Sequence, residues 1–126
     1  MALFEKRVPK EEFAQKMREQ TKSLAIRTIR LYRELPQAEE ARVVGRQLLR
    51  SATSTAANYR AVCRARSEAE YFAKLSITVE EADESALWLE IIAETEILPS
   101  SRVMPLHADF EEITAILSTA RKTTST

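Results

Sequence analysis

The sequence predicts an all-α fold, an antiparallel up-and-down four-helix bundle. Its 126 residues include one glycine and four prolines, too few chain breakers for a sandwich or barrel with a turn every ten or so residues. Apolar residues instead recur at alternating steps of three and four, which is the spacing of one face of a helix. With 44% hydrophobic and 30% charged residues, the composition is that of an ordinary globular protein. We expect one domain over residues 1–126.

The first helix is expected over about 9–34. Pro9 suits an opening helical turn, and Glu11 and Glu12 complement the positive end of the helix dipole. The helix should end at Leu35, because the following Pro36 pushes that residue out of helical geometry. The residues expected to face inward are Ala14, Met17, Thr21, Leu24, Thr28 and Leu31.

The second helix is expected over about 38–66. Gly45 lies in its first half, and a mid-helix glycine costs roughly 1 kcal/mol relative to alanine, so we expect a packing reason for it. The stretch from Ser51 to Ala57 has no large side chain, and its hydroxyls are expected to serve close approach of a neighbouring helix. The residues expected to face inward are Ala41, Val44, Leu48, Ala52, Thr55, Tyr59 and Val62.

The third and fourth helices are expected over about 67–97 and 102–122. Ser67 and Glu70 fit a capping box, in which the serine accepts from the backbone and the glutamate reaches back. Pro99 should follow the end of the third helix, and residues 123–126 should fray. The inward residues are expected to be Phe72, Leu75, Val79, Ala82, Ala86, Leu89 and Ala93, then Leu106, Phe110, Ile113, Leu117 and Ala120.

Charge is distributed unevenly, although the net charge is zero. Residues 1–66 contain 15 Lys/Arg and 7 Asp/Glu, and residues 67–126 contain 4 and 12. At 100° per residue, five arginines lie within about 80° of one another, opposite the inward face of the second helix. This arginine stripe either binds phosphate, or is a solvated surface, or meets acidic residues of another subunit. Its members are Arg42, Arg46, Arg50, Arg60 and Arg64, with Arg27, Arg30 and Arg33 of the first helix as additional candidates.

The third helix is apolar on two faces, and a helix of this kind is buried on both. Four helices leave nothing inside one bundle to cover the second face, so we expect a subunit contact there. One hypothesis is that this face receives the arginine-rich surface of a neighbour, a heterologous contact that closes into a ring. The alternative is that the tryptophan lies across its own bundle. The residues of this outer face are Ile77, Glu80, Glu84, Leu87, Trp88 and Ile91.

We expect no catalytic residues, no metal site and no cofactor. A di-iron bundle needs Glu-x-x-His on paired helices, and no glutamate precedes the single histidine, His107, by three. Cys63 and His107 are the one nucleophile–base candidate, but we expect Cys63 to be a small buried hydrophobe and His107 to be a surface or capping residue. Asn58 should be a buried polar residue that fixes helix register, or else contacts a ligand, with the first interpretation favoured.

Several sequence blocks resemble the bacterial "four helix bundle protein" family. These proteins are also called intervening-sequence proteins, because some are encoded inside insertions in large-subunit ribosomal RNA genes. The resemblance covers about 13–97 well and the last helix loosely. The blocks are GRQLLRSATS (45–54), ANYR (57–60), RARS (64–67), EYFAKL (70–75), EEADE (80–84) and WLE (88–90).

The resemblance implies an antiparallel four-helix bundle that assembles into homopentameric rings and has no catalytic activity. Related accessory proteins of diversity-generating retroelements share the ring, and bind a reverse transcriptase and nucleic acid through a basic surface. Two functions therefore remain open. The first is a homo-oligomeric nucleic-acid-binding accessory protein, with RNA or DNA as its partner. The second is an oligomeric scaffold that binds another protein and uses its arginines in subunit contacts.

We expect a cytoplasmic protein with no membrane partner. The first ten residues contain no apolar signal core. No apolar run approaches the roughly 20 residues that a membrane span requires.

Overall fold

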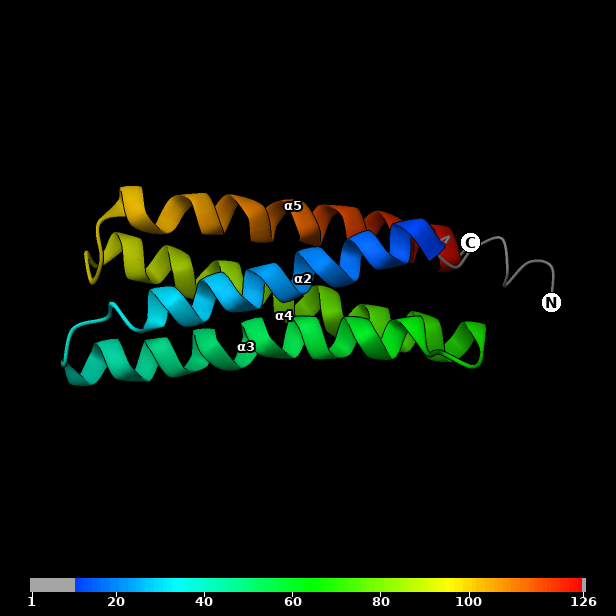
Figure 1. The fold of residues 1–126 in the computed structure, drawn as a ribbon, viewed down its shortest axis with the longest axis horizontal. Helices are drawn as coiled ribbons and strands as arrows, with labels where there is room; N and C mark the ends of the chain where they lie inside the picture. The colour runs from blue at the N-terminus through cyan, green and yellow to red at the C-terminus, as the bar shows by residue number, and fades with distance from the viewer. Residues whose placement is uncertain (1–10, 126) are drawn as a thin grey trace.

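The described part of the chain folds as an up-and-down bundle of four antiparallel helices, as predicted (Figure 1). The computed structural model describes residues 11–125, so the predicted helix start at Pro9 lies outside the described residues. The helices are α2 (Glu11–Tyr32), α3 (Glu39–Cys63), α4 (Glu68–Glu94) and α5 (Ser100–Ser125).

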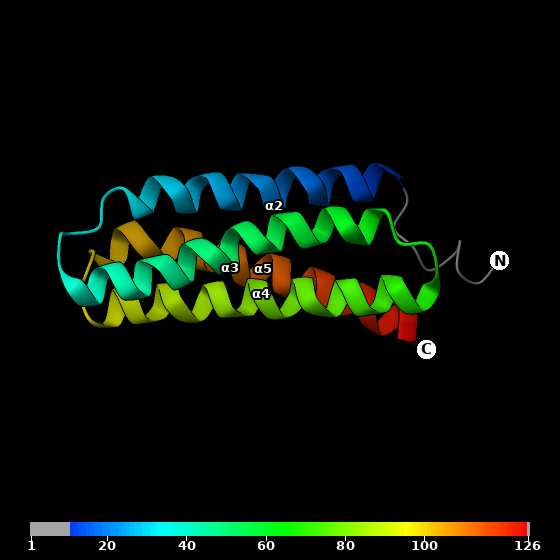
Figure 2. The same cartoon turned by 90° about the horizontal axis from the view of Figure 1, so that it is seen from below.

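The helices pack in sequence order around the bundle. α3 packs against α2 and α4, and α4 packs against α3 and α5, whereas the contact between α2 and α5 is the smallest of the four neighbouring pairs. Figure 2 shows α3 lying between α2 and α4 along the whole length of the bundle. The α3–α4 pair therefore forms the most extensive helix contact of the molecule, and its outer surface carries the charged candidates.

The turn between α3 and α4 begins earlier than the sequence suggested. α3 ends at Cys63, three residues before the predicted Arg66, because Ser67 takes an extended conformation (φ −155°) to cap α4. The Ser67 hydroxyl accepts from the Glu70 backbone N–H at 3.0 Å, as predicted. The Glu70 carboxylate accepts a hydrogen bond from the Arg66 backbone N–H at 3.3 Å. In a standard capping box it would accept from the Ser67 N–H, one residue later.

α4 ends at Glu94 rather than near Ile97, because the chain reverses in a left-handed turn. Glu96 has a φ of 60°, and the Ile97 N–H donates to the Ile92 carbonyl at 3.0 Å while the Glu96 N–H donates to Ala93 at 3.1 Å. This is the Schellman arrangement, with glutamate in the position that usually holds glycine.

The last helix is longer than predicted at both ends. α5 begins at Ser100 and continues to Ser125, past the expected end at residue 122. Pro105 lies inside it. Pro105 is the sixth residue of α5, past the first turn, so it removes one i→i−4 hydrogen bond, the one to the Ser101 carbonyl.

The core follows the predicted inward faces with one clear exception. Tyr71 is buried (1% exposed), whereas Phe72, predicted to face inward, is 39% exposed. Val44, Ala93 and Ala120 pack against the core but are only partly buried. The fully buried large side chains include Met17, Leu31, Leu48, Tyr59, Leu75, Leu89, Leu106, Phe110 and Leu117.

Gly45 has the packing reason that the sequence predicted. A Cβ atom there would lie 2.4 Å from Leu35 Cδ1 and 3.1 Å from the Tyr32 ring. The end of α2 and its following loop thus pack directly on the α3 backbone at Gly45, and a side chain there would require Leu35 to shift.

Candidate nucleic-acid interface and subunit surface

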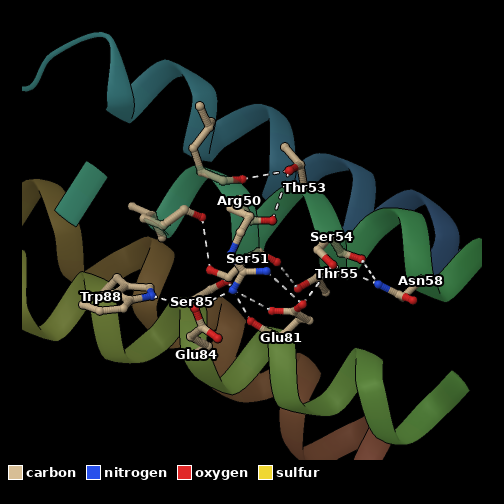
Figure 3. Close-up of polar contacts among 12 residues, drawn as sticks. Arg50, Ser51, Thr53, Ser54, Thr55, Asn58, Glu81, Glu84, Ser85 and Trp88 are labelled. Carbon is tan, nitrogen blue, oxygen red and sulfur yellow. Dashed lines mark hydrogen bonds and ion pairs between the residues drawn. The ribbon is translucent and has the colours of Figure 1, made fainter. Parts of the chain in front are cut away.

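The arginine stripe of α3 is interrupted in its middle by ion pairs within the chain. The Arg50 guanidinium contacts Glu81 at 3.1 Å and Glu84 at 2.6 Å, both on α4. Figure 3 shows Arg50 crossing from α3 to these two carboxylates. The guanidinium donors aimed at α4 are therefore already used, although half of the side chain is solvent-exposed.

A polar network surrounds the Arg50 pairs and links α3 to α4 (Figure 3). Ser54 Oγ donates to Glu81 at 3.1 Å, and the Trp88 indole N–H donates to Glu84 at 3.0 Å. The Trp88 hydrogen bond, and after it Arg50, hold the pKa of Glu84 below its ordinary value of 4.5, against the opposing effect of desolvation. The hydrogen bonds of Arg50 to Glu81, and after it to Glu84, raise the pKa of Arg50. Glu84 is thus held as a carboxylate by two donors from its own chain.

Small hydroxyl residues bring α3 and α4 close beside this network. The Ser51 and Ser85 hydroxyls share a hydrogen bond of 2.8 Å across the buried interface, and Thr55 donates to the Ser51 carbonyl at 2.8 Å. The hydroxyls therefore serve close helix approach, as predicted. Asn58 is only partly buried, and its side-chain amide donates to Ser54 on its own helix. These hydrogen bonds lie within α3 and therefore do not fix the register between helices.

The remaining stripe arginines line two recesses near opposite ends of α3. The first basic recess has a volume of about 290 Å³ and lies where α2 turns into α3; it is lined by Tyr32, Arg33, Leu35, Pro36, Gln37, Arg42 and Arg46. The second basic recess has a volume of about 480 Å³ and lies where α3 turns into α4; it is lined by Ala57, Arg60, Ala61, Arg64, Arg66, Glu70 and Lys74.

Most cations of the two recesses lack a carboxylate partner. Arg42 donates to Gln37, and Arg66 makes a long ion pair of 3.8 Å with Glu70. Within the part of the chain that the structure describes, none of the ion pairs involves Arg33, Arg46, Arg60 or Arg64. At 1.5 Å per residue, Arg46 and Arg60 are separated by about 21 Å along the helix axis.

The outer face of α4 is as apolar as the sequence predicted. Ile77 and Leu87 are 38% and 46% exposed, and Trp88 and Ile91 are partly covered. Glu80 is exposed on the same face, whereas Glu84 is turned to Arg50 and Trp88. The polar N–H edge of the Trp88 indole therefore faces its own bundle. Part of the ring and the neighbouring Leu87 remain exposed as an apolar surface.

Sequence comparison identifies the family of this bundle. The model of the 23S rRNA-intervening sequence protein family matches residues 14–119. The chain belongs to this family. The crystal structure of a Bacteroides thetaiotaomicron protein of unknown function from the S23 ribosomal protein family is similar, with 31% sequence identity and a TM-score of 0.80. The similarity covers 86% of this chain and 97% of that one. No curated protein matches the chain.

Two further expectations about single residues of this intervening-sequence family member were wrong. Cys63 is exposed rather than buried, because it is the last residue of α3 and the chain turns away there. His107 is buried (6% exposed) rather than on the surface. Its Nε2 lies 2.8 Å from Glu90 of α4, and its Nδ1 lies 3.6 Å from Glu111, one turn further along α5. These carboxylates give the ring polar partners in a buried position.

Cys63 and His107 do not form a nucleophile–base pair. α3 ends and α5 begins at opposite ends of the bundle (Figure 1). The cluster of His107 with Glu90 and Glu111 was missed by sequence reasoning, which tested only a glutamate three residues before the histidine. The detectable signal was the spacing of four residues between His107 and Glu111, which places both on one helix face. Across the described helices of this family member, none has the length and apolar character needed to cross a membrane.

Proposed function

We propose that this intervening-sequence family member is a non-catalytic homo-oligomer, a pentameric ring, that binds nucleic acid through its two basic recesses. The observation that carries the proposal is the division of the arginine stripe. Arg50 is neutralised by α4, whereas Arg46, Arg60 and Arg64 face solvent-accessible recesses without a described carboxylate partner. Arginine suits phosphate because its planar donors match phosphate oxygens.

The spacing of the recesses suits an extended polyanion. The roughly 21 Å between Arg46 and Arg60 corresponds to about six nucleotide steps measured along a duplex axis, at 3.4 Å per step. A single small anion would occupy one recess only. The recesses contain few aromatic side chains, with Tyr32 in the first, so the proposed contact is with the phosphate backbone more than with stacked bases.

The outer face of α4 supports self-association. Leu87 is exposed beside the partly buried Trp88 and Ile91, and Ile77 is exposed about three turns earlier on α4. Exposed apolar side chains around a tryptophan are typical of subunit contacts. The fivefold ring follows from the family resemblance. Because Arg50 and Glu84 pair within one chain, the subunit contact we propose is mainly apolar around Trp88.

One observation favours the second function, a protein scaffold. Glu80 and Asp83 are exposed at the outer side of α4, and could receive the recess arginines of a neighbouring subunit. Those arginines would then be buried in the ring. Charge reversal of Arg46 or Arg64 would in that case break the assembly rather than weaken nucleic-acid binding.

The experiment is to measure assembly mass by light scattering, with and without a structured RNA fragment, at 50 and 200 mM salt. The proposal expects a pentamer that gains mass with RNA at low salt. Fluorescence anisotropy then gives the slope of log K against log salt for wild type, Arg46→Gln, Arg64→Gln and the control Arg50→Gln. Each recess variant should reduce the slope by about 0.7–0.9, and the control should not.

The outcomes separate the two functions. A pentamer that gains no mass with RNA at either salt would contradict nucleic-acid binding and favour the scaffold. A monomer would contradict the role of the α4 outer face. Equal slopes in Arg46→Gln and Arg50→Gln would contradict the assignment of the first recess.

A further inference from the structure

Glu90, His107 and Glu111 bring three metal-ligating side chains together between α4 and α5. One ligand atom from each lies within 4.8 Å of the other two. The His107 side chain is 8% exposed, whereas those of Glu90 and Glu111 are 43% and 63% exposed. The cluster thus has one fixed imidazole and two carboxylates that can adjust from the solvent side.

The types of ligand match a divalent transition metal. Zn²⁺ is bound by histidine nitrogen and by carboxylate oxygen at about 2.0–2.2 Å, and sites with three protein ligands leave one position for water. Two ligands four residues apart on a helix meet one ion from the same face, as in other zinc sites. His107 and Glu111 have this spacing on α5, and Glu90 adds a ligand from α4.

The three ligand atoms are close together but are not yet arranged around one ion. Ligands about 2.1 Å from a tetrahedral centre lie roughly 3.3–3.5 Å apart. The Glu90 oxygen lies 2.8 Å from Nε2 of His107, and the Glu111 oxygen lies 3.6 Å from Nδ1, so the two carboxylates face different ring nitrogens. Because the side chains of both glutamates are solvent-accessible, one of them can swing to the ring nitrogen that the other faces, and binding of a single ion requires this movement.

We propose that Glu90, His107 and Glu111 form a mononuclear site for a divalent transition metal of the Zn²⁺ class. The site is separate from the two basic recesses, whose lining includes none of these three residues. It is also distinct from the dinuclear Glu-x-x-His site that the sequence argued against, since it needs one histidine and one ion. A bound ion would clamp α4 to α5 near the start of α5. The competing explanation is an ion pair of a protonated histidine with its two carboxylates.

The test uses the full chain without a histidine tag and with Cys63→Ser, because the exposed thiol is itself a zinc ligand. Competition against a chromogenic chelator measures Zn²⁺ affinity and stoichiometry. The proposal expects one ion per chain and a loss of at least tenfold in affinity for Glu90→Gln and for Glu111→Gln. The matched control is Glu112→Gln, an exposed glutamate next to Glu111, which should bind as the parent does.

A second measurement keeps the test independent of variant folding. The chain has a single histidine, so nitrogen-detected NMR of the imidazole reports on His107 alone. Zn²⁺ should shift one ring nitrogen strongly at one equivalent. The proposal is overturned if saturating Zn²⁺ leaves the ring resonances unchanged, or if Glu111→Gln and Glu112→Gln bind Zn²⁺ equally well.

Discussion

Replacing Arg50 by methionine should lower the stability of the bundle, because Arg50 holds two carboxylates of α4. The methionine keeps the aliphatic part of the side chain and removes both ion pairs. Arg50 is half exposed, so each pair contributes at the lower end of about 0.2–1 kcal/mol. Glu81 has a side chain only 17% exposed, and leaving it beside Glu84 without a cation adds roughly 0.5–1 kcal/mol.

The expected total loss is about 1–2 kcal/mol in the free energy of unfolding, or roughly 3–8 °C in Tm for a domain of this size. Urea unfolding followed by Trp88 fluorescence measures it at a fixed protein concentration, since association also stabilises the chain. The double-mutant cycle with Glu84→Gln should give a coupling of about 0.2–0.5 kcal/mol between the two side chains.

Arg46→Met is the matched control, since Arg46 is an exposed arginine on the same helix with no described ion pair. It should change stability by less than about 0.5 kcal/mol. The reasoning would be refuted if the Arg50 and Arg46 variants were equally stable. It would also fail if Arg50→Met lost RNA affinity at full stability, since Arg50 would then be a binding residue.

Three further predictions concern the pH response and the two special backbone positions. Because Trp88 and Arg50 lower the pKa of Glu84, their contribution should be complete above pH 4.5 and be lost as pH falls through the lower folded-state value. Trp88 fluorescence should therefore change in that acid range, and Glu84→Gln should abolish the change. Gly45→Val should destabilise by about 1–3 kcal/mol in urea unfolding, because its side chain would overlap Leu35. Glu96→Gly should raise Tm by a few degrees, since it removes a left-handed cost of about 1–2 kcal/mol and adds back part of it as glycine entropy.

Glu80 supplies the controls for two of these. Glu80 is exposed on α4, so Glu80→Gln should leave the fluorescence change of Trp88 at acid pH intact. If Glu80→Gln abolished this change as Glu84→Gln does, the assignment of the change to Glu84 would be contradicted. Glu80→Gly should lower Tm, because mid-helix glycine costs about 1 kcal/mol. If Glu96→Gly lowered Tm by a similar amount, the left-handed conformation of Glu96 would not be a source of strain, and the prediction would be contradicted. Gly45→Ala separates steric overlap from helix propensity, and greater stability in Gly45→Val than in Gly45→Ala would contradict the overlap.

Helix positions could be predicted from sequence because each helix repeats its apolar residues with a helical period. The exception, Phe72 instead of Tyr71, arose on α4, where apolar residues lie on both faces. A periodic pattern then fits two lines that differ by 100°, the rotation of one residue. The early end of α4 depends on the left-handed turn at Glu96, which carries no glycine signal.

The candidate site could be predicted only in part. The rotation of 100° per helical residue predicts that the stripe arginines share one face of the helix. Their ion pairing, however, depends on which carboxylates of α4 lie opposite each arginine. Arg50 meets Glu84 and Ser51 meets Ser85, in both cases 34 residues apart. This register is set by close packing of α3 on α4, and a single sequence does not reveal it.

The α3–α4 register also decides how the charged surface is divided between stability and binding. Because Glu81 and Glu84 are used by Arg50, they cannot neutralise the arginines at the two ends of α3. Because Glu84 also accepts from Trp88, the position of the tryptophan is tied to the same carboxylate. A subunit that covers Trp88 would hold Glu84, and through it Arg50, in place. Assembly through α4 should therefore stiffen the middle of the stripe and leave the two basic recesses open on either side, which is the arrangement that an extended polyanion requires.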